Sequence, residues 1–174
     1  MRVLRRLLVV ALALVVAPSA AGAIVLTVTV TTAGPVTAPG VTLTGLDQTK
    51  TFTVASRVTY SDDTGNGGNN LGWKLNVSAT APTVAGRSLP FLIVTGVARA
   101  NCTNDTTGTA CVNPTNNVTW PITVNTTPAK VYNATAPTGK GLVVLTATYQ
   151  ISYPANAIAG TYASTITYAV ATGP

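Results

Sequence analysis

The chain of 174 residues contains no histidine, no glutamate and only four aspartates. Without histidine, nucleophilic catalysis cannot use a Ser-His or a Cys-His pair. A pair of catalytic carboxylates is not expected either, because Asp62 and Asp63 are sequence neighbours whose side chains would diverge in a strand or turn. The sequence also lacks a glycine-rich phosphate loop followed by a helical pattern. We therefore expect a protein that is not an enzyme and that needs no cofactor.

Charge is scarce as well, since charged residues make up 8% of the chain. Three of the ten basic residues lie within the first six positions, and the other seven stand against four aspartates, which gives a net charge of +3 from residue 24 onward. These seven cations are scattered singly, without a run or a stripe. A nucleic-acid partner is therefore not expected, because such partners are bound by clustered basic side chains.

The first 23 residues have the pattern of a secretory signal peptide. Three arginines precede an apolar run at 7–17, and small residues at 21–23 form a cleavage site that places the mature N-terminus at Ile24. An uncleaved membrane anchor is the alternative, but the apolar run is shorter than the about 20 residues that span a bilayer. No later stretch is long and apolar enough for a span. We expect a secreted, extracellular protein without a membrane span after cleavage.

After residue 23, the sequence shows no helical periodicity of apolar residues. Apolar and polar residues alternate instead. In residues 71–80, Trp73, Leu75, Val77 and Ala79 point to one side and polar residues to the other, which is typical of a half-buried strand. Similar patterns predict strands at 24–31, 41–43, 51–55, 57–61, 91–97, 118–124, 130–134, 143–153 and 162–170. We expect an all-β fold, a single antiparallel β-sandwich of about eight to ten strands over residues 24–174, preceded by a signal-peptide helix at 1–23.

Cys102 and Cys111 are the only cysteines. An even number in an exported chain favours a disulfide, with two reactive thiols as the alternative. The bond would close a loop of about ten residues, which is worth roughly 2.7 kcal/mol in the chain-entropy model. A zinc site is not expected, because no histidine and no further cysteine exist to complete it.

The segment 62–70 combines two aspartates with glycines and asparagines and superficially resembles a calcium loop. It lacks the glutamate that closes such a loop, and its aspartates have the wrong spacing. Glycine supplies positive φ in turns, and Asp and Asn bond to the nearby backbone. We therefore expect a turn at 62–70 and no bound metal.

Two segments carry a resemblance to a known family. The sequence GWKL at 72–75, with Asp62 and the glycine-rich loop before it, resembles the proximal motif of WxL-domain proteins, bacterial surface proteins of Gram-positive organisms. The family's distal motif is a tyrosine followed by a Leu-Thr-Trp-Thr-Leu strand near the C-terminus, and residues 160–174 resemble it. The resemblance covers about residues 36–174. The matching distal positions are Tyr162, Ile166, Thr167, Tyr168 and Val170.

The chain departs from the family pattern at three positions. Tyr168 replaces the distal Trp, Ile166 replaces the distal Leu, and Thr64 stands where the family usually has Arg. The resemblance implies non-covalent attachment to the cell wall through peptidoglycan, with co-exported surface proteins as further partners. The candidate binding residues are then Trp73, Leu75, Tyr162, Ile166 and Tyr168.

The alternation pattern leaves two roles open for these residues. Apolar faces of sandwich strands are usually buried, which favours a structural role for Trp73 and Leu75. Exposed aromatic rings would instead suit stacking on the faces of sugars.

The strand expected at 24–31 suggests a function of another class. It is amphipathic, and a segment rich in glycine and proline follows it at 34–40. Such a strand could leave its own domain and complete the sheet of a neighbour. The chain would then be a structural subunit of an extracellular fibre or surface layer, with copies of itself as partners.

Overall fold

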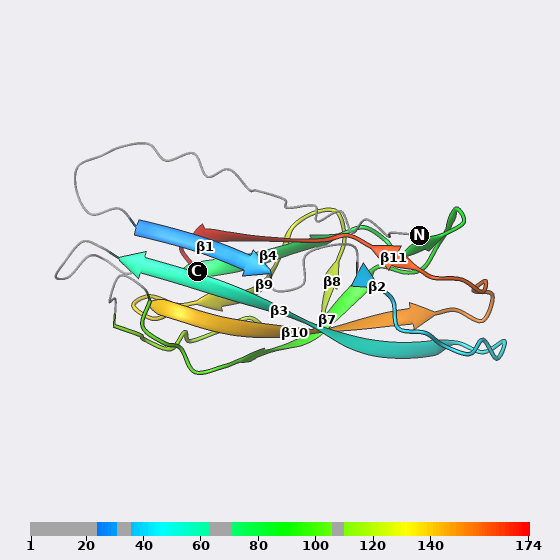
Figure 1. The fold of residues 1–174 in the computed structure, drawn as a ribbon, viewed down its shortest axis with the longest axis horizontal. Coiled ribbons are helices and arrows are strands. Elements are labelled where there is room, and N and C mark those ends of the chain that lie inside the picture. Colours follow the sequence, from blue (N-terminus) through cyan, green and yellow to red (C-terminus); the bar gives the residue numbers. More distant parts are fainter. Residues whose placement is uncertain (1–23, 31–35, 63–70, 106–109) are drawn as a thin grey trace, which may run out of the picture.

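The computed structural model describes residues 24–30, 36–62, 71–105 and 110–174, which form strands and no helix (Figure 1). The strands are β1 (Ile24–Val30), β2 (Val36–Thr37), β3 (Gln48–Asp62), β4 (Trp73–Ala79), β5 (Thr83–Val84), β6 (Arg87–Ser88), β7 (Leu92–Arg99), β8 (Ile122–Val124), β9 (Ala129–Ala134), β10 (Gly141–Tyr153), β11 (Ala163–Ser164) and β12 (Ile166–Thr172). None of the described segments is a helix long and apolar enough to cross a membrane. The helix expected at 1–23 lies outside the described residues.

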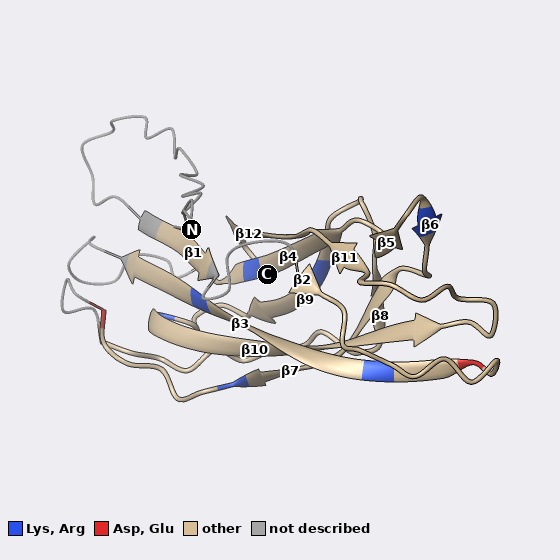
Figure 2. Cartoon of the chain, turned by 45° about the vertical axis from the view of Figure 1, so that its right-hand side comes forward, with Lys and Arg blue, Asp and Glu red and all other residues tan. Residues whose placement is uncertain are grey.

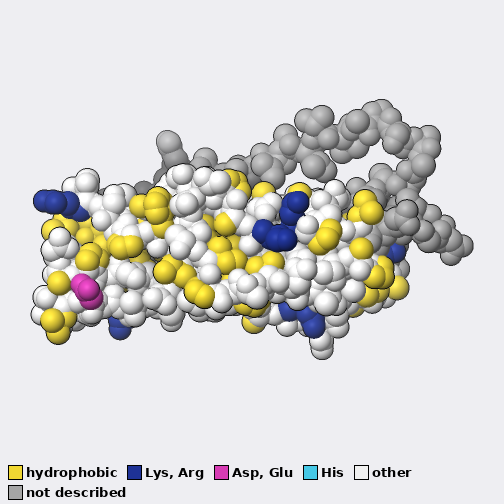
Figure 3. All heavy atoms as spheres, turned by 180° about the vertical axis from the view of Figure 1, so that it is seen from behind, with side chains coloured by type: hydrophobic (Ala, Val, Ile, Leu, Met, Phe, Trp, Pro, Cys, Tyr) yellow, Lys and Arg dark blue, Asp and Glu magenta, His cyan; other side chains and the backbone are white. Residues whose placement is uncertain are grey.

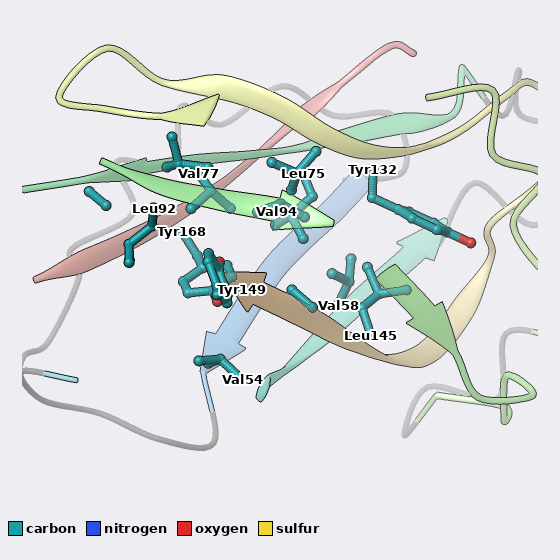
Figure 4. Packing of buried hydrophobic residues seen from close by; sticks show 14 of the residues in the cluster. Val54, Val58, Leu75, Val77, Leu92, Val94, Tyr132, Leu145, Tyr149 and Tyr168 are labelled. Atoms are coloured by element: carbon teal, nitrogen blue, oxygen red, sulfur yellow. The ribbon is translucent and has the colours of Figure 1, made fainter. Parts of the chain in front are cut away.

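The strands form three sheets, and all strand pairs are antiparallel. A five-stranded sheet has the order β1-β3-β10-β7-β8, and a three-stranded sheet has the order β12-β4-β9. A third sheet, of the order β2-β11-β5-β6, consists of two-residue strands. The five-stranded and three-stranded sheets are the two layers of a sandwich, and their inward side chains form one core (Figure 4). The all-β sandwich expected from the sequence is confirmed.

The core follows from the period of two in the strands. In β10, buried and half-buried residues alternate over all 13 positions, and in β4 over all seven. Because successive side chains of a strand point to opposite faces, this alternation buries one face of each sheet. The largest fully buried side chains include Trp73, Tyr60, Tyr149 and Leu75.

Strand β3 is longer than the sequence pattern indicated. The sequence leaves open whether 57–61 continues the strand at 51–55 or pairs with it, and the structure has one continuous strand of 15 residues. It pairs with β10 from Gln48 opposite Tyr153 to Tyr60 opposite Gly141, and its last two residues extend beyond β10. On its other side, β1 pairs only with the second half, from Ser56 to Asp62.

Some expected strands were wrong in place or extent. Residues 41–43 form no strand, because this segment leads from β2 to β3 and the Gln48 side chain donates to the Thr42 carbonyl and the Thr44 hydroxyl. The strand expected at 118–124 is confined to β8, after Pro121, which has no N–H for a ladder bond.

The last strand also differs from expectation, and a hairpin follows β4. The strand expected at 162–170 is divided into β11 and β12 by Thr165, whose backbone N–H bonds to the Thr80 hydroxyl at 3.0 Å. Strands β5 and β6 pair as a hairpin over residues 83–88. Ala85 and Gly86 turn this hairpin with φ values of 46° and 76°, the positive range that hairpin turns require.

Candidate functional site

The two halves of the WxL-like pattern lie on neighbouring strands of the three-stranded sheet. Strands β4 and β12 pair over seven residues, with Trp73 opposite Thr172 and Val77 opposite Tyr168. The fold thus brings together two segments that are far apart in the sequence. Of the five candidate residues, Trp73, Leu75, Tyr162 and Tyr168 are buried and Ile166 is half-buried.

Trp73 is fully buried, with 0% of its surface exposed. Its indole Nε1 donates a hydrogen bond to the Gly139 carbonyl at 2.9 Å, and its ring centroid lies 5.9 Å from that of Tyr132. A Cβ on Gly139 would lie 2.6 Å from the indole nitrogen, so this glycine leaves the room that the tryptophan needs. The apolar ring of Trp73 is therefore packed inside the protein, and its N–H has a hydrogen-bond partner there.

Gly72 explains why glycine precedes the tryptophan. Its φ of 70° lies in the left-handed region that side chains avoid. A Cβ there would lie 2.1 Å from the Ala134 carbonyl oxygen, which is a backbone atom of the neighbouring strand β9. The Gly-Trp pair of the motif is therefore a packing device at the entry of β4.

Tyr168 connects the two layers of the sandwich. Its hydroxyl lies 2.6 Å from the hydroxyl of Tyr149 on β10, and the Tyr149 ring stacks on Phe52 with centroids 5.3 Å apart. Both tyrosines are labelled in the core in Figure 4. Burial raises the pKa of Tyr149, and it raises the pKa of Tyr168 to about 12. Both hydroxyls are therefore protonated at neutral pH.

Tyr162 has a similar internal role at the small sheet. Its hydroxyl accepts from the backbone N–H of Ile158 and donates to the carbonyl of the same residue, both at 3.2 Å. Its ring meets Tyr153 edge to face, with centroids 6.1 Å apart. A groove of about 400 Å³ lies beside this pair, and Leu43 is among its lining residues.

A solvent-facing surface lies on the opposite side of the same strands. Lys74, Asn76 and Ser78 alternate with the buried residues of β4, and the register places Thr167 beside Ser78 and Lys130 beside Asn76. We call these five residues the outer polar row. It contains two ammonium groups and no carboxylate. Lys and Arg are otherwise widely spaced over the fold (Figure 2), and a view of one face shows them as isolated groups among neutral side chains (Figure 3).

The two cysteines form a disulfide with Cα atoms 5.8 Å apart. Asn113 Oδ1 accepts from the Cys102 N–H at 2.9 Å, and Asn104 Oδ1 accepts from the Cys111 N–H at 3.0 Å. Thr103 forms an isolated bridge with Leu142 at the start of β10. The disulfide therefore holds a surface loop against the five-stranded sheet.

The chain after this loop covers the free edge of β9. Asn133 is buried, its N–H donates to Asn116 Oδ1, and its own Oδ1 accepts from the Asn117 N–H, both at 3.0 Å. Trp120 Nε1 donates to the Val131 carbonyl at 3.0 Å. These hydrogen bonds occupy backbone groups at the edge of β9 that a further strand would otherwise pair with.

No group of three or more His, Cys, Asp or Glu that could hold a metal ion occurs among the described residues. Asp105 is buried, and its carboxylate accepts a hydrogen bond from the Ser61 hydroxyl. The turn expected at 62–70 lies, from residue 63, outside the described residues.

Sequence reasoning did not identify the residues that hold the motif in place. Gly139, which receives the indole N–H, lies in a turn without a distinguishing pattern. Tyr149 stood out only as one of several apolar residues on the inner face of β10. Their importance depends on contacts across the sandwich, which strand periodicity does not reveal.

Comparisons with protein-family models, with curated proteins and with solved structures found no match for this chain.

Proposed function

We propose that this chain is a secreted, non-enzymatic protein of the bacterial cell surface that attaches non-covalently to the wall through a WxL-like domain. The observation that carries the proposal is the pairing of β4 with β12, which joins the two halves of the WxL-like pattern in one sheet. This proximity would allow the two segments to act together at one surface of the sheet. Peptidoglycan is the proposed partner.

The burial of Trp73, Leu75 and Tyr168 changes which side chains would touch the wall. Because these side chains are packed in the core, they are not available to the wall. The side chains that would contact peptidoglycan are those of the outer polar row, on the opposite face of the same sheet. Its hydroxyl and amide groups can hydrogen-bond to a glycan, and the ammonium groups of Lys74 and Lys130 attract the carboxylates and phosphates of wall polymers. The residues opposite these lysines in the register, Ala171 and Asn133 for Lys74 and Asn76 for Lys130, are uncharged.

Sedimentation with purified peptidoglycan sacculi tests this proposal. We expect the mature protein to pellet with the sacculi at low salt and to be released progressively as salt rises, because exposed charges are screened beyond a distance of about 10 Å at 0.1 M. The double variant K74Q/K130Q should shift the bound fraction towards the supernatant.

A matched control removes two exposed charges from the other layer, as K50Q/R57Q on β3. This variant has the same net charge as K74Q/K130Q and should bind as the wild type does. Complete recovery of the wild type in the supernatant would contradict the proposed function. Equal losses in both variants would show attraction by net charge alone and would contradict the role of the outer polar row.

A further inference from the structure

Strand β1 forms a backbone ladder on one side only, with β3. All seven of its residues pair with β3, from Ile24 opposite Asp62 to Val30 opposite Ser56. It is the edge strand, because β3 is its only neighbour in the five-stranded sheet. It lies between β3 and β12 in Figure 1, and no ladder joins it to β12.

The core nevertheless needs the side chains of β1. Leu26 and Val28 are half-buried and pack against the core, while Thr27 and Thr29 are exposed. The register places Leu26 opposite Tyr60 and Val28 opposite Val58, two residues with 0% exposure. Removing β1 would expose this part of the core and the backbone groups along half of β3, both of which are costly to leave uncovered.

We propose that β1 is exchanged between copies of this chain, so that the β1 of one copy fills the place beside β3 in another. The second copy is the partner that fits, because its β1 has the same sequence and can form the same seven residue pairs and bury the same Leu26 and Val28. Exchange conserves these contacts, and the cost of association is therefore small.

The position of β1 in the chain favours this exchange. With cleavage after Ala23, as the sequence predicts, β1 is the first segment of the mature chain and can move without the threading of any other element. Only five residues connect it to β2, and a connection of that length spans at most about 18 Å. A hinge of this length is compatible with exchange between copies.

Cross-linking of mixed cysteine variants tests the exchange. Thr27 on β1 and Thr59 on β3 are directly opposite. T27C and T59C are purified separately, mixed at high concentration, incubated, and treated with a short thiol-to-thiol cross-linker. Exchange predicts a covalent dimer of twice the monomer mass, whose cross-linked peptides contain one residue from each variant.

The control uses the pair Ser78 and Thr167, which are opposite each other on β4 and β12. S78C mixed with T167C should give no such dimer, because β12 is not exchanged. The double variant T27C/T59C confirms the pairing itself, as an intramolecular link in the monomer or an intermolecular link in the exchanged form. An intramolecular link in this variant together with no T27C–T59C dimer after mixing would overturn the proposal, as would equal dimer formation in both mixtures. None of these results depends on binding to sacculi.

Discussion

Strands β1 and β12 are both edge strands of seven residues, and each pairs with a single strand of its sheet. They differ in what holds them beyond the backbone ladder. The buried Tyr168 of β12 reaches across the sandwich to the hydroxyl of Tyr149. The described side chains that β1 packs against the core are the half-buried aliphatic residues Leu26 and Val28.

The two edge strands therefore differ in the free energy that their detachment from the sheet costs. A buried aromatic residue contributes a large apolar area, and its detachment also leaves a buried polar atom without its partner. The half-buried aliphatic side chains of β1 contribute less apolar area and have no polar atom to satisfy. We therefore expect β1 to detach more readily than β12.

The largest expected effect comes from removing the anchor of β12. Tyr168→Ala should lower the free energy of unfolding by about 3–5 kcal/mol, the usual cost of truncating a buried aromatic side chain. Leu26→Ala on β1 should cost only about 1–2 kcal/mol, because that side chain is half-buried. Urea unfolding followed by tryptophan fluorescence measures both. Equal losses would remove the distinction between the two strands.

The exposed Thr167→Ala is the control on β12. It should change the free energy of unfolding by less than about 0.5 kcal/mol, since its side chain lies outside the core. A large loss in this control would mean that any change to the strand destabilises it.

The next effect concerns β4, the partner of β12. Gly72→Ala should cost about 2–4 kcal/mol, because the left-handed backbone strain adds to the collision with the Ala134 carbonyl. Gly45→Ala has a similar φ of 75° and no atom near its Cβ, so it should cost only about 1–2 kcal/mol. Thermal unfolding of the two variants separates strain from collision. A similar Tm for both would contradict the packing role of Gly72.

A smaller effect is expected from the hydroxyl pair alone. Tyr168→Phe leaves the buried hydroxyl of Tyr149 without this partner and should cost about 1–3 kcal/mol. The double variant Y149F/Y168F removes both hydroxyls and should be closer to the wild type than the single variant. This double-mutant cycle isolates the bond across the sandwich, and additive losses would show that the two hydroxyls do not interact.

The last effect appears only at alkaline pH and grows with the pH. Burial raises the pKa of Tyr149, and it raises that of Tyr168 to about 12, so the folded protein holds these protons more tightly than the unfolded chain does. Their contribution is complete below about pH 10 and is lost as the pH rises above it, at about 1.4 kcal/mol per pH unit for each proton.

Urea midpoints between pH 9 and 12 measure this loss. The wild type should lose stability more steeply than Y149F/Y168F, because the other ionisable groups are common to both proteins. Parallel curves would contradict the link between the hydroxyl pair and the alkaline limit.

Periodicity determined most of the secondary structure from the sequence. The alternation at 71–80 predicted which side chains of β4 are inside, and the alternation at 143–153 did the same for β10. The pattern worked there because a period of two assigns each residue to a face without reference to any partner. It failed at 41–43, where three residues of suitable composition form no strand.

Only the tertiary structure decided which strands are neighbours. Nothing local in residues 24–31 indicates an edge strand beside β3, and nothing local in 162–170 pairs β12 with β4. Likewise, the sequence does not decide whether Tyr168 binds a sugar at the surface or contacts Tyr149 in the core. The packing of the two sheets against each other decides it. Strand order and cross-sheet contacts depend on the total fit of distant segments, whereas the face of a residue depends on its immediate neighbours. The sequence thus determined an all-β fold, and the tertiary structure placed Trp73, Leu75 and Tyr168 in its core.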